Sequence, residues 1–323
     1  MLKILILIKL KKKYSTLLQS MKSAESKKDF IDIEKDFESL KDYKDAVKQA
    51  EICKQKINEI EDKEKKLQKK LMITAIIIGI IIAFAVLLVT VIIPTIKKYN
   101  FISRYSQEVY DKFGLVDKGS TINFGTYEQD NNLSNGKEDI EWEVLDIQDG
   151  KALVISKYGL DCQKYNSKFE EVTWETCSIR SWLNKIFYNN AFSSDEQSMI
   201  DESTVTADAN PDFNTDPGNE TIDKLFLLSA TEAKKYFNSD SKRVCTPTAY
   251  VAESYTETNA YYWWLRTPGK DGSYAAYVDD SGKIISYGIE VAYVYRIGLG
   301  VLTYNEINFK KIVRPAMWIN LES

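Results

Sequence analysis

Two groups of aromatic, arginine and asparagine residues are the side chains best suited to chemistry in this sequence. They consist of Trp174, Arg180 and Asn184, and of Trp263, Arg266 and Arg314. Arginine binds carboxylates or sugar hydroxyls through its planar fork of donors, and tryptophan stacks on an apolar face. The two groups therefore indicate a groove for a polar ligand. In the structural alternative the tryptophans lie in the core and the arginines bind buried carbonyls or acids. We favour that alternative because no nucleophile–base pair accompanies the two groups.

The composition excludes several classes of catalysis. The 323 residues include no histidine, which excludes Ser-His-Asp and Cys-His catalysis and histidine-ligated metal sites. The four cysteines are scattered and form no CxxC motif; they are Cys53, Cys162, Cys177 and Cys245. A disulfide between Cys162 and Cys177 would close a short loop, and the sequence leaves it undecided. We expect no enzymatic activity, no metal and no cofactor.

Two acidic segments also admit a functional interpretation. Asp271, Asp279 and Asp280 lie near glycines and offer oxygen ligands for calcium, but turn chemistry alone explains Asp and Gly there. Glu141 and Glu143 offer paired carboxylates of the kind used in glycoside hydrolysis. Because they alternate with apolar residues, we expect them on one solvated strand face.

A long apolar segment divides the chain into two parts. Residues 71–96 read LMITAIIIGIIIAFAVLLVTVIIPTI and contain no charge. A bilayer core about 30 Å thick needs roughly 20 apolar residues of helix. The segment is apolar on all sides instead of along one stripe. It predicts one transmembrane helix over 71–96.

The flanking charges predict the orientation of this helix. Its basic neighbours are Lys63, Lys65, Lys66, Lys69 and Lys70 before it, and Lys97, Lys98 and Arg104 after it. The side richer in lysine and arginine usually stays in the cytoplasm. We therefore expect a single-pass cell-membrane protein with a cytoplasmic N-terminus and an extracytoplasmic C-terminal domain. The acidic excess of that domain argues against nucleic-acid binding.

Residues 1–70 have the pattern of a helical region. Two apolar faces follow each other: Phe30, Ile33, Phe37 and Leu40, and then Ala46, Val47, Ala50, Cys53 and Ile57. Their spacing of three to four residues, with a break at 41–43, predicts an antiparallel helix pair. Either the segment with Tyr14, Leu17, Leu18 and Met21 completes a small bundle, or a protein partner covers the open face. Residues 58–70 are expected to continue as a charged helix into the membrane.

After residues 97–118, a predicted connector, the pattern changes to short strands with a few helices. Apolar and polar residues alternate in INFGTY, IEWEVLDI and KALVISKY, with a turn at 148–150 between the last two. A helix is predicted to bury Ile179, Trp182, Leu183, Ile186 and Phe187 on one face. Ser193 with Glu196, and Ser229 with Glu232, have the spacing of capping boxes.

Further strands are predicted towards the C-terminus. KLFLLS is expected to be buried, and YYWWLRTPG, SYAAYVDDSGKIISYG, EVAYVYRIG and KIVRPAMWIN complete the set. Strands that flank a few helices predict an α+β domain over 119–323 with mainly antiparallel strands.

The order of the short motifs resembles an uncharacterised bacterial family, a domain of unknown function. The motifs include INFGTYEQD, EWEVLDI, WETCSIRSWLN, WWLRTPG, YVDDSG and VRPAMWIN. The resemblance covers about 121–321 and implies a cell-envelope protein, often with a helical DYKDA-type repeat and a membrane helix. FESLKDYKDAVKQAEICK is similar to a tetratricopeptide-type repeat. WLRTPG and VRPA also resemble the strands of formylglycine-generating-enzyme and C-type-lectin-like domains. The segment EVAYVYRIGLGVLTYNEINFKK departs from the pattern and has room for extra strands.

Three functions follow as hypotheses. The first is a membrane-anchored protein whose extracytoplasmic domain binds a cell-envelope glycan, peptide or protein, and which signals or scaffolds. The second is an envelope enzyme of formylglycine-generating-like ancestry, which requires Cys177 or Cys245 in an accessible cleft. The third is a purely structural surface anchor, which requires both aromatic–arginine groups to be fully buried.

Overall fold

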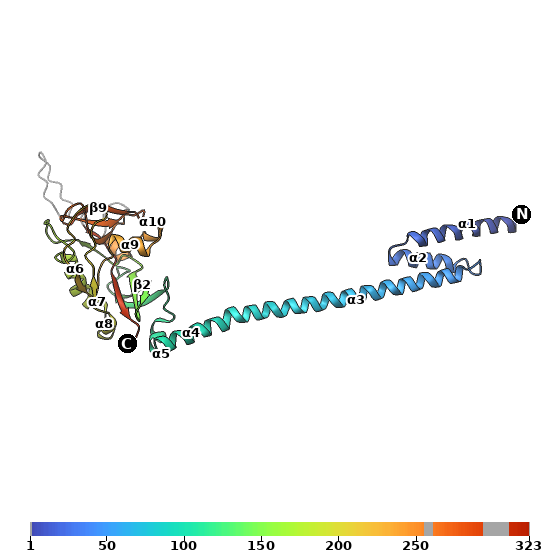
Figure 1. Ribbon diagram of the computed structural model, residues 1–323, viewed down its shortest axis with the longest axis horizontal. Helices are drawn as coiled ribbons and strands as arrows, with labels where there is room; N and C mark the ends of the chain where they lie inside the picture. Colours follow the sequence, from blue (N-terminus) through green and yellow to red (C-terminus); the bar gives the residue numbers. More distant parts are fainter. Residues whose placement is uncertain (1, 255–260, 293–309, 323) are drawn as a thin grey trace, which may run out of the picture. The chain divides into compact units, whose positions relative to one another are not determined.

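The chain forms two compact units, Met1–Pro94 and Thr95–Ser323. The computed structural model describes residues 2–254, 261–292 and 310–322, and Figure 1 labels several of its helices and strands. Each unit has its own cluster of buried apolar side chains. The two are therefore described separately.

The first unit contains the predicted helix pair. Its elements are α1 (Leu2–Ser23), α2 (Lys27–Glu38) and α3 (Ala46–Leu87). Ser26 and Asp29 form a capping box at the start of α2, and the turn before α3 contains Lys41 and Lys44 at positive φ. Tyr14 and Leu17 of α1 are buried with the faces of α2 and α3. Thus α1 completes a small bundle, the first of the two alternatives given by the sequence.

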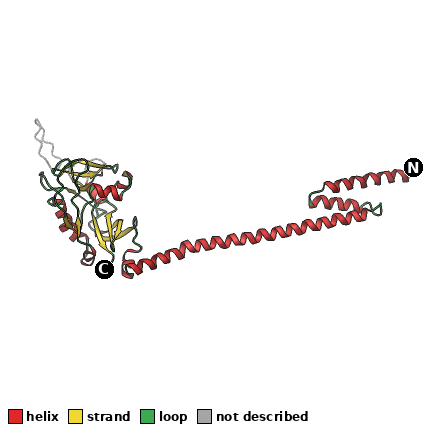
Figure 2. Cartoon of the chain, viewed as in Figure 1, coloured by secondary structure: helices red, strands yellow, loops and turns green. Residues whose placement is uncertain are grey.

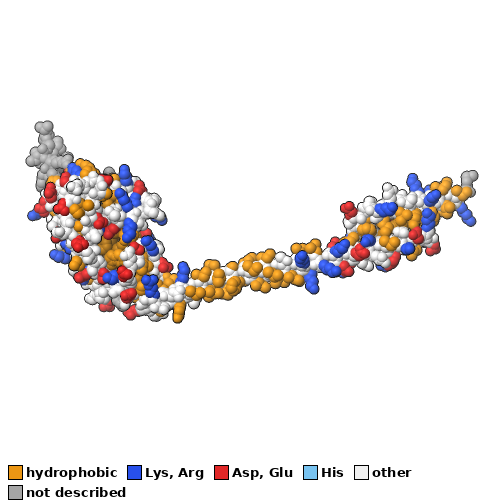
Figure 3. All heavy atoms as spheres, viewed as in Figure 1, with side chains coloured by type: hydrophobic (Ala, Val, Ile, Leu, Met, Phe, Trp, Pro, Cys, Tyr) orange, Lys and Arg blue, Asp and Glu red, His pale blue; other side chains and the backbone are white. Residues whose placement is uncertain are grey.

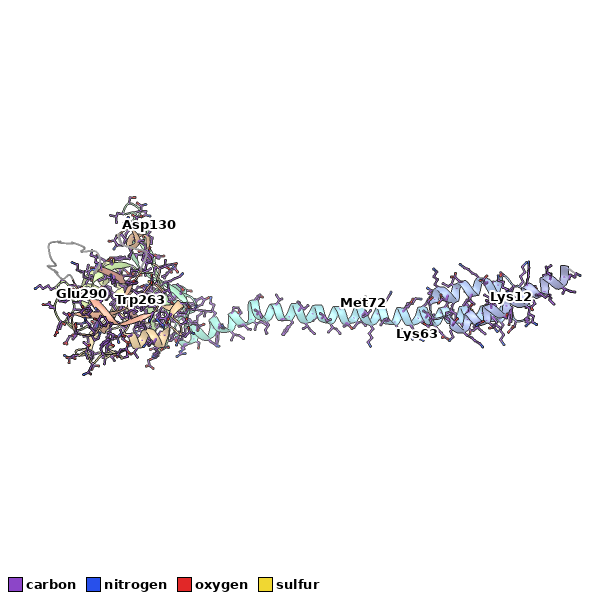
Figure 4. The ribbon with its side chains drawn as sticks, turned by 90° about the horizontal axis from the view of Figure 1, so that it is seen from above. Lys12, Lys63, Met72, Asp130, Trp263 and Glu290 are labelled. Atoms are coloured by element: carbon purple, nitrogen blue, oxygen red, sulfur yellow. The ribbon has the colours of Figure 1, made fainter. Side chains whose placement is uncertain are left out.

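The predicted membrane segment lies on a continuous helix. Among the described residues, one helix is long and apolar enough to cross a membrane; it spans Ala46–Arg104, and none of its most apolar window is buried. Figure 3 shows apolar side chains all along this part of the helix after a group of lysines. Figure 4 labels Lys63 shortly before Met72 on the same helix. The charged segment thus continues directly into the apolar one.

A π-helical turn, η1 (Leu88–Ile92), joins α3 to α4 (Ile93–Arg104). It ends two residues before Pro94, which has no backbone N–H to donate and whose ring clashes with the carbonyl four residues earlier. The N–H of Ile93 donates to the carbonyl of Leu88, five residues back. The wider turn therefore accommodates the proline without ending the helix.

The predicted connector is part of the second unit's core. α4 and α5 (Gln107–Phe113) occupy most of 97–118. Phe101, Val109, Phe113 and Val116 are buried in the same cluster as the strands. The compact unit accordingly begins near Thr95 and not at 119, because apolar residues in these helices pack on the sheet.

The described strands of the second unit, yellow in Figure 2, form three sheets. A four-stranded sheet has the order β1 (Thr121–Tyr127), β2 (Glu138–Gln148), β3 (Lys151–Ser156) and β11 (Ala316–Asn320). A five-stranded sheet has the order β4 (Asp161–Lys164), β10 (Lys310–Val313), β7 (Trp263–Pro268), β8 (Tyr274–Val278) and β9 (Ile284–Glu290). β5 (Ser203–Val205) pairs with β6 (Thr221–Asp223). Among the pairs of described strands only β10 and β7 run parallel, and one isolated bridge, Gly159 with Pro247, is also parallel. This confirms the α+β class with mainly antiparallel strands.

Local sequence signals are confirmed at several ends of elements. Asp149 and Gly150 have φ values of 47° and 74°, as a two-residue hairpin turn between β2 and β3 requires. Both capping boxes form, at α8 (Ser194–Met199) and α9 (Ala230–Tyr236). The other helices are α6 (Ser178–Trp182), η2 (Leu183–Phe187), α7 (Tyr188–Ala191), α10 (Asp240–Arg243) and α11 (Ala249–Ser254).

Some local predictions are wrong. Ile186, predicted to be buried, is 53% exposed, because the π-helical turn η2 changes the residue spacing on that face. Residues 225–229 of KLFLLS are buried, whereas Lys224 is half-buried. The segment forms one isolated bridge, Phe226 with Ala316, instead of a strand. Most of the predicted strand EVAYVYRIG and of the divergent segment around it lies outside the described residues.

Candidate functional site

The first predicted group converges on the buried carboxylate of Asp223 in β6. This side chain is only 2% exposed. It accepts hydrogen bonds from Trp174 Nε1 at 2.9 Å, Thr221 Oγ1 at 2.6 Å and Arg180 Nε at 2.7 Å, with Asn184 Nδ2 at 3.4 Å. A buried carboxylate is costly unless it is paired and hydrogen-bonded. These donors satisfy both of its oxygens, so Asp223 serves to fix the side chains around it.

Asn184 joins the π-helical turn η2 to the chain that follows β6. Its Oδ1 accepts from the backbone N–H groups of Lys224 at 3.0 Å and Leu225 at 3.1 Å. Its Nδ2 donates to the carbonyls of Leu225 at 2.8 Å and Arg180 at 3.1 Å. The amide is thereby held in one orientation. Single π-helical turns frequently mark functional sites, and this one carries a predicted site residue.

A pocket of about 430 Å³ opens beside this network. Arg180, Lys185, Tyr188 and Lys224 contribute to its wall. The Arg180 side chain remains 26% exposed. Lys224 Nζ donates to the Tyr188 hydroxyl at 3.0 Å and lies 4.7 Å from the centre of its ring. The pocket therefore offers cations, amides and an aromatic ring, which suit a ligand with anionic groups and hydroxyls.

Arg266, from the second predicted group, is enclosed and bound to α9. Its side chain is 2% exposed. Nη1 donates to the Leu227 carbonyl at 3.0 Å, Nε donates to the Thr206 carbonyl at 3.2 Å, and both Nη atoms contact Glu232. Glu232 also accepts from the N–H of Ser229 in the capping box of α9. Arg266 thus ties β7 to the start of α9.

Trp263 and Arg314 pack together in the core. Trp263 is fully buried and Arg314 is 3% exposed. The guanidinium lies 5.4 Å from the Trp263 ring and 5.1 Å from the Phe237 ring. Its Nε donates to the Ser156 carbonyl at 2.7 Å, and Glu143 approaches Nη2 at 3.6 Å. Among the described residues, none hydrogen-bonds to the buried Nη1. The second group is therefore enclosed. Of the first group, Arg180 and Asn184 line the pocket, whereas Trp174 is buried.

The thiols required by the enzyme hypothesis are buried. Cys177 is 3% exposed and Cys245 is 2% exposed. Burial raises the pKa of Cys177 to about 12 and also raises the pKa of Cys245. All four cysteines are free, including the pair Cys162 and Cys177. Since the thiolate is the nucleophilic form, these thiols are unsuited to attack a substrate.

Acidic side chains elsewhere are largely engaged by their own loops. Asp279 Oδ1 accepts from the N–H groups of Ser281 at 3.0 Å and Lys283 at 2.9 Å, which is turn chemistry. Glu128, Asp130 and Glu138 bring one carboxylate oxygen each within 4.8 Å of the others. Partial desolvation and the charge of Glu138 raise the pKa of Glu128. In the described part of the chain, these three carboxylates are the group whose spacing best suits a metal ion.

Sequence reasoning missed Asp223, Tyr188 and Lys224. The strand TID alternates, but its polar residues Thr221 and Asp223 are buried and Ile222 is 67% exposed. Alternation reveals two faces without saying which one is buried. A short strand whose apolar residue faces solvent therefore gives no sequence signal for the burial of its polar residues. The residues around Asp223 in the sequence do not predict its role.

Comparison with protein families identifies a match for the second unit. The family described as Domain of unknown function (DUF6273) matches residues 149–321. The matched range includes the Asp223 network, the pocket and both predicted groups. No curated protein and no solved structure matches the chain.

Proposed function

The chain belongs to the family described as Domain of unknown function (DUF6273), and from that premise we propose that it is a membrane-anchored protein that binds a cell-envelope ligand. It crosses the membrane once, with the N-terminal helices in the cytoplasm and the unit Thr95–Ser323 outside. Its N-terminal region is similar to a tetratricopeptide-type repeat and binds a protein partner. The C-terminal unit binds a glycan or peptide through the pocket beside Asp223.

The exposed apolar segment of α3 carries the proposal of anchoring. Ile80, Ile81 and Phe84 are 64%, 62% and 60% exposed, and none of the most apolar window is buried. Burying such a side chain contributes roughly 1.5–3 kcal/mol. A segment of this length would lose far more in water than a fold of ordinary stability can offset. A bilayer removes this penalty, and the lysines that precede the segment suit its cytoplasmic surface.

Charge and rigidity support the pocket as the ligand site. Arg180, Lys185 and Lys224 face it against Glu202 and Asp223, and Asp223 is already saturated by donors. The network holds Arg180 in place before any ligand arrives, so little side-chain freedom is lost on binding. A carboxylate of a glycan or peptide would bind to the cations while its hydroxyls or amides meet Asn189 and Ser181.

Two measurements test this proposal separately. For anchoring, the full-length protein should sediment with membranes and resist extraction at alkaline pH without detergent. Recovery in the soluble fraction would contradict anchoring. For binding, the detergent-purified chain should bind acidic glycan or peptide fragments of the envelope, and Lys185→Ala/Lys224→Ala should weaken this at least about 10-fold. Lys234→Ala, an exposed lysine of α9, is the control.

The structural-anchor hypothesis predicts a different result in the second measurement. If no envelope fragment binds and the double variant behaves like the control, the pocket has no ligand of this class. The whole domain would then have a structural role at the cell surface, as the enclosed Arg266 and Arg314 already have within it.

A further inference from the structure

The first two turns of α1 expose an apolar surface to solvent. Five consecutive residues are 51–66% exposed: Ile4, Leu5, Ile6, Leu7 and Ile8. The buried core of this unit begins only at Tyr14. A two-turn helix without tertiary contacts gains nothing from packing and is marginal in water. This surface therefore has the character of an interface that lacks its partner.

The same end of α1 is strongly basic. Lys3, Lys9, Lys11 and Lys12 are exposed, and α1 contains no acidic residue. Lys9 and Lys12 also border a mainly apolar groove of about 370 Å³ between α1 and α2; Figure 4 labels Lys12 on this bundle. Five consecutive helical residues point to all sides of the helix, so this end of α1 is apolar all round and is flanked by lysines. Such a surface calls for an occupant that is both apolar and acidic.

The helix geometry excludes the bilayer of the proposed anchor as that occupant. Tyr14 bonds to Asp45 beside the start of α3, and Lys27, just after α1, pairs with Glu61 at 2.6 Å. α1 thus runs in the same direction as α3, and its apolar end points away from the membrane segment. The 26 residues from Asp45 to Leu71 span about 39 Å at the helical rise. Even at a tilt of about 40° the surface stays roughly 30 Å from the bilayer.

A second copy of the chain is a poor candidate for the partner that covers the exposed end of α1. Two such α1 ends would bring their lysines together without any acid between them, and like charges at close range oppose association. The α2 helix carries the exposed acids Asp29 and Asp32, and its Asp36 borders the groove, where it already pairs with Lys13 at 3.0 Å. This helix therefore offers the charge without the apolar surface.

We propose that the N-terminal half of α1 docks an acidic amphipathic helix of a partner protein. The leucine or isoleucine side chains of the partner, at i, i+3, i+4 and i+7, pack on Ile4–Ile8 and enter the groove. Its glutamates or aspartates meet Lys9, Lys11 and Lys12. This proposal specifies the protein partner already proposed for the N-terminal helices. It rests on the proposed membrane anchoring only in the argument that the surface is too far from the bilayer.

The experiment uses the full chain in nanodiscs of neutral lipid. The probe is a labelled synthetic helix with leucine at two heptad positions and glutamate elsewhere, and the matched probe has lysine in place of glutamate. Binding is measured by fluorescence anisotropy. The glutamate peptide should bind, and the lysine peptide should bind at least about 10-fold more weakly. Circular dichroism verifies that each variant keeps its helices.

Variants locate the site. Ile6→Asp/Leu7→Asp and Lys9→Glu/Lys12→Glu should each weaken binding of the glutamate peptide at least about 10-fold. Val47→Asp, at a position 63% exposed on α3, and Lys48→Glu/Lys54→Glu are controls with the same chemical changes and should retain affinity.

Several outcomes would overturn the proposal. They are equal binding of the two peptides, no binding of either, concentration-dependent dimerisation of the nanodisc-held chain through Ile6 and Leu7, or capture by vesicles containing phosphatidylglycerol in preference to the peptide. Failure to enter nanodiscs at all would instead refute membrane anchoring. The two failures are thus distinguishable.

Discussion

Replacing Asp223 by asparagine tests the network that builds the candidate site. The change keeps the shape of the side chain but removes its charge and turns one acceptor into a donor. Whichever way the amide is oriented, its NH₂ group faces Arg180 Nε or the donors Trp174 Nε1 and Thr221 Oγ1, which lie 2.6–2.9 Å from the carboxylate. At least one strong hydrogen bond is lost, and a buried donor is left unpaired.

The magnitude follows from these contacts. A hydrogen bond to a charged group contributes about 1.5–3 kcal/mol, and an unsatisfied buried donor costs about 1–3 kcal/mol. The Arg180 side chain is 26% exposed, so water replaces part of its lost bond. We therefore take the lower part of the range, about 3 kcal/mol in all. For a unit of this size, that lowers Tm by roughly 6–12 °C.

Tryptophan fluorescence during thermal unfolding of the detergent-solubilised chain measures this change. All 6 tryptophans lie after Thr95, so the signal reports the second unit alone. Asp280→Asn, which removes an exposed carboxyl, is the control and should leave Tm unchanged. If Asp223→Asn unfolds within about 2 °C of the parent, the buried carboxylate does not stabilise the site as argued.

Three further predictions concern other parts of the chain. Arg314→Met should destabilise the protein less than Arg266→Met. Within the described part of the chain, the guanidinium of Arg314 has an unbonded Nη1 and donates to a single carbonyl, that of Ser156, whereas Arg266→Met should cost about 3 kcal/mol by leaving a carboxylate and two carbonyls unpaired; a larger loss for the first than for the second would contradict this. Maleimide should not label Cys162 or Cys177 of the folded chain at pH 8, because burial raises the pKa of both thiols to about 12. The two neutral, buried thiols contribute their full stability at pH values below 9, which is the pKa of the thiols in the unfolded chain. This stability is lost as the pH rises from 9 to about 12, so the protein should unfold at lower urea concentrations over that range. Ile81→Arg alone should preserve membrane insertion. One arginine raises the insertion free energy by about 3 kcal/mol, whereas each of the more than 20 apolar residues lowers it by roughly 0.3–0.6 kcal/mol. Loss of the variant from alkaline-washed membranes would show that the insertion free energy of the segment is less favourable than this sum.

Local signals predicted much of the fold. The β2–β3 hairpin turn was predictable because Asp149 and Gly150 suit positive φ. The capping boxes depend on a spacing of three residues, which is visible in the sequence. The prediction for Ile186 failed because the π-helical turn adds a residue to the helical repeat. That turn is stabilised by Asn184 bonds to residues 40 and 41 positions later, which no local window contains.

The candidate site was only partly visible for the same reason. Trp174, Arg180 and Asn184 could be proposed from their types, but not the carboxylate that gathers them, which lies 39–49 residues further along the chain. Arg266 and Arg314 have the same side chain, yet one is saturated by six contacts and the other keeps an unbonded nitrogen. Residue type alone does not separate these cases.

The order of the residues is sufficient to predict the apolar helix of membrane length, the helical N-terminal region and the strand-rich C-terminal part, because each depends on the periodicity or length of a continuous segment. Contacts between distant segments were needed to show that Asp223 is the centre of the first group, that the second group is enclosed, and that the basic apolar end of α1 points away from the apolar segment of α3. These outcomes depend on which distant segments meet, and the free energy of such contacts is set by packing between elements.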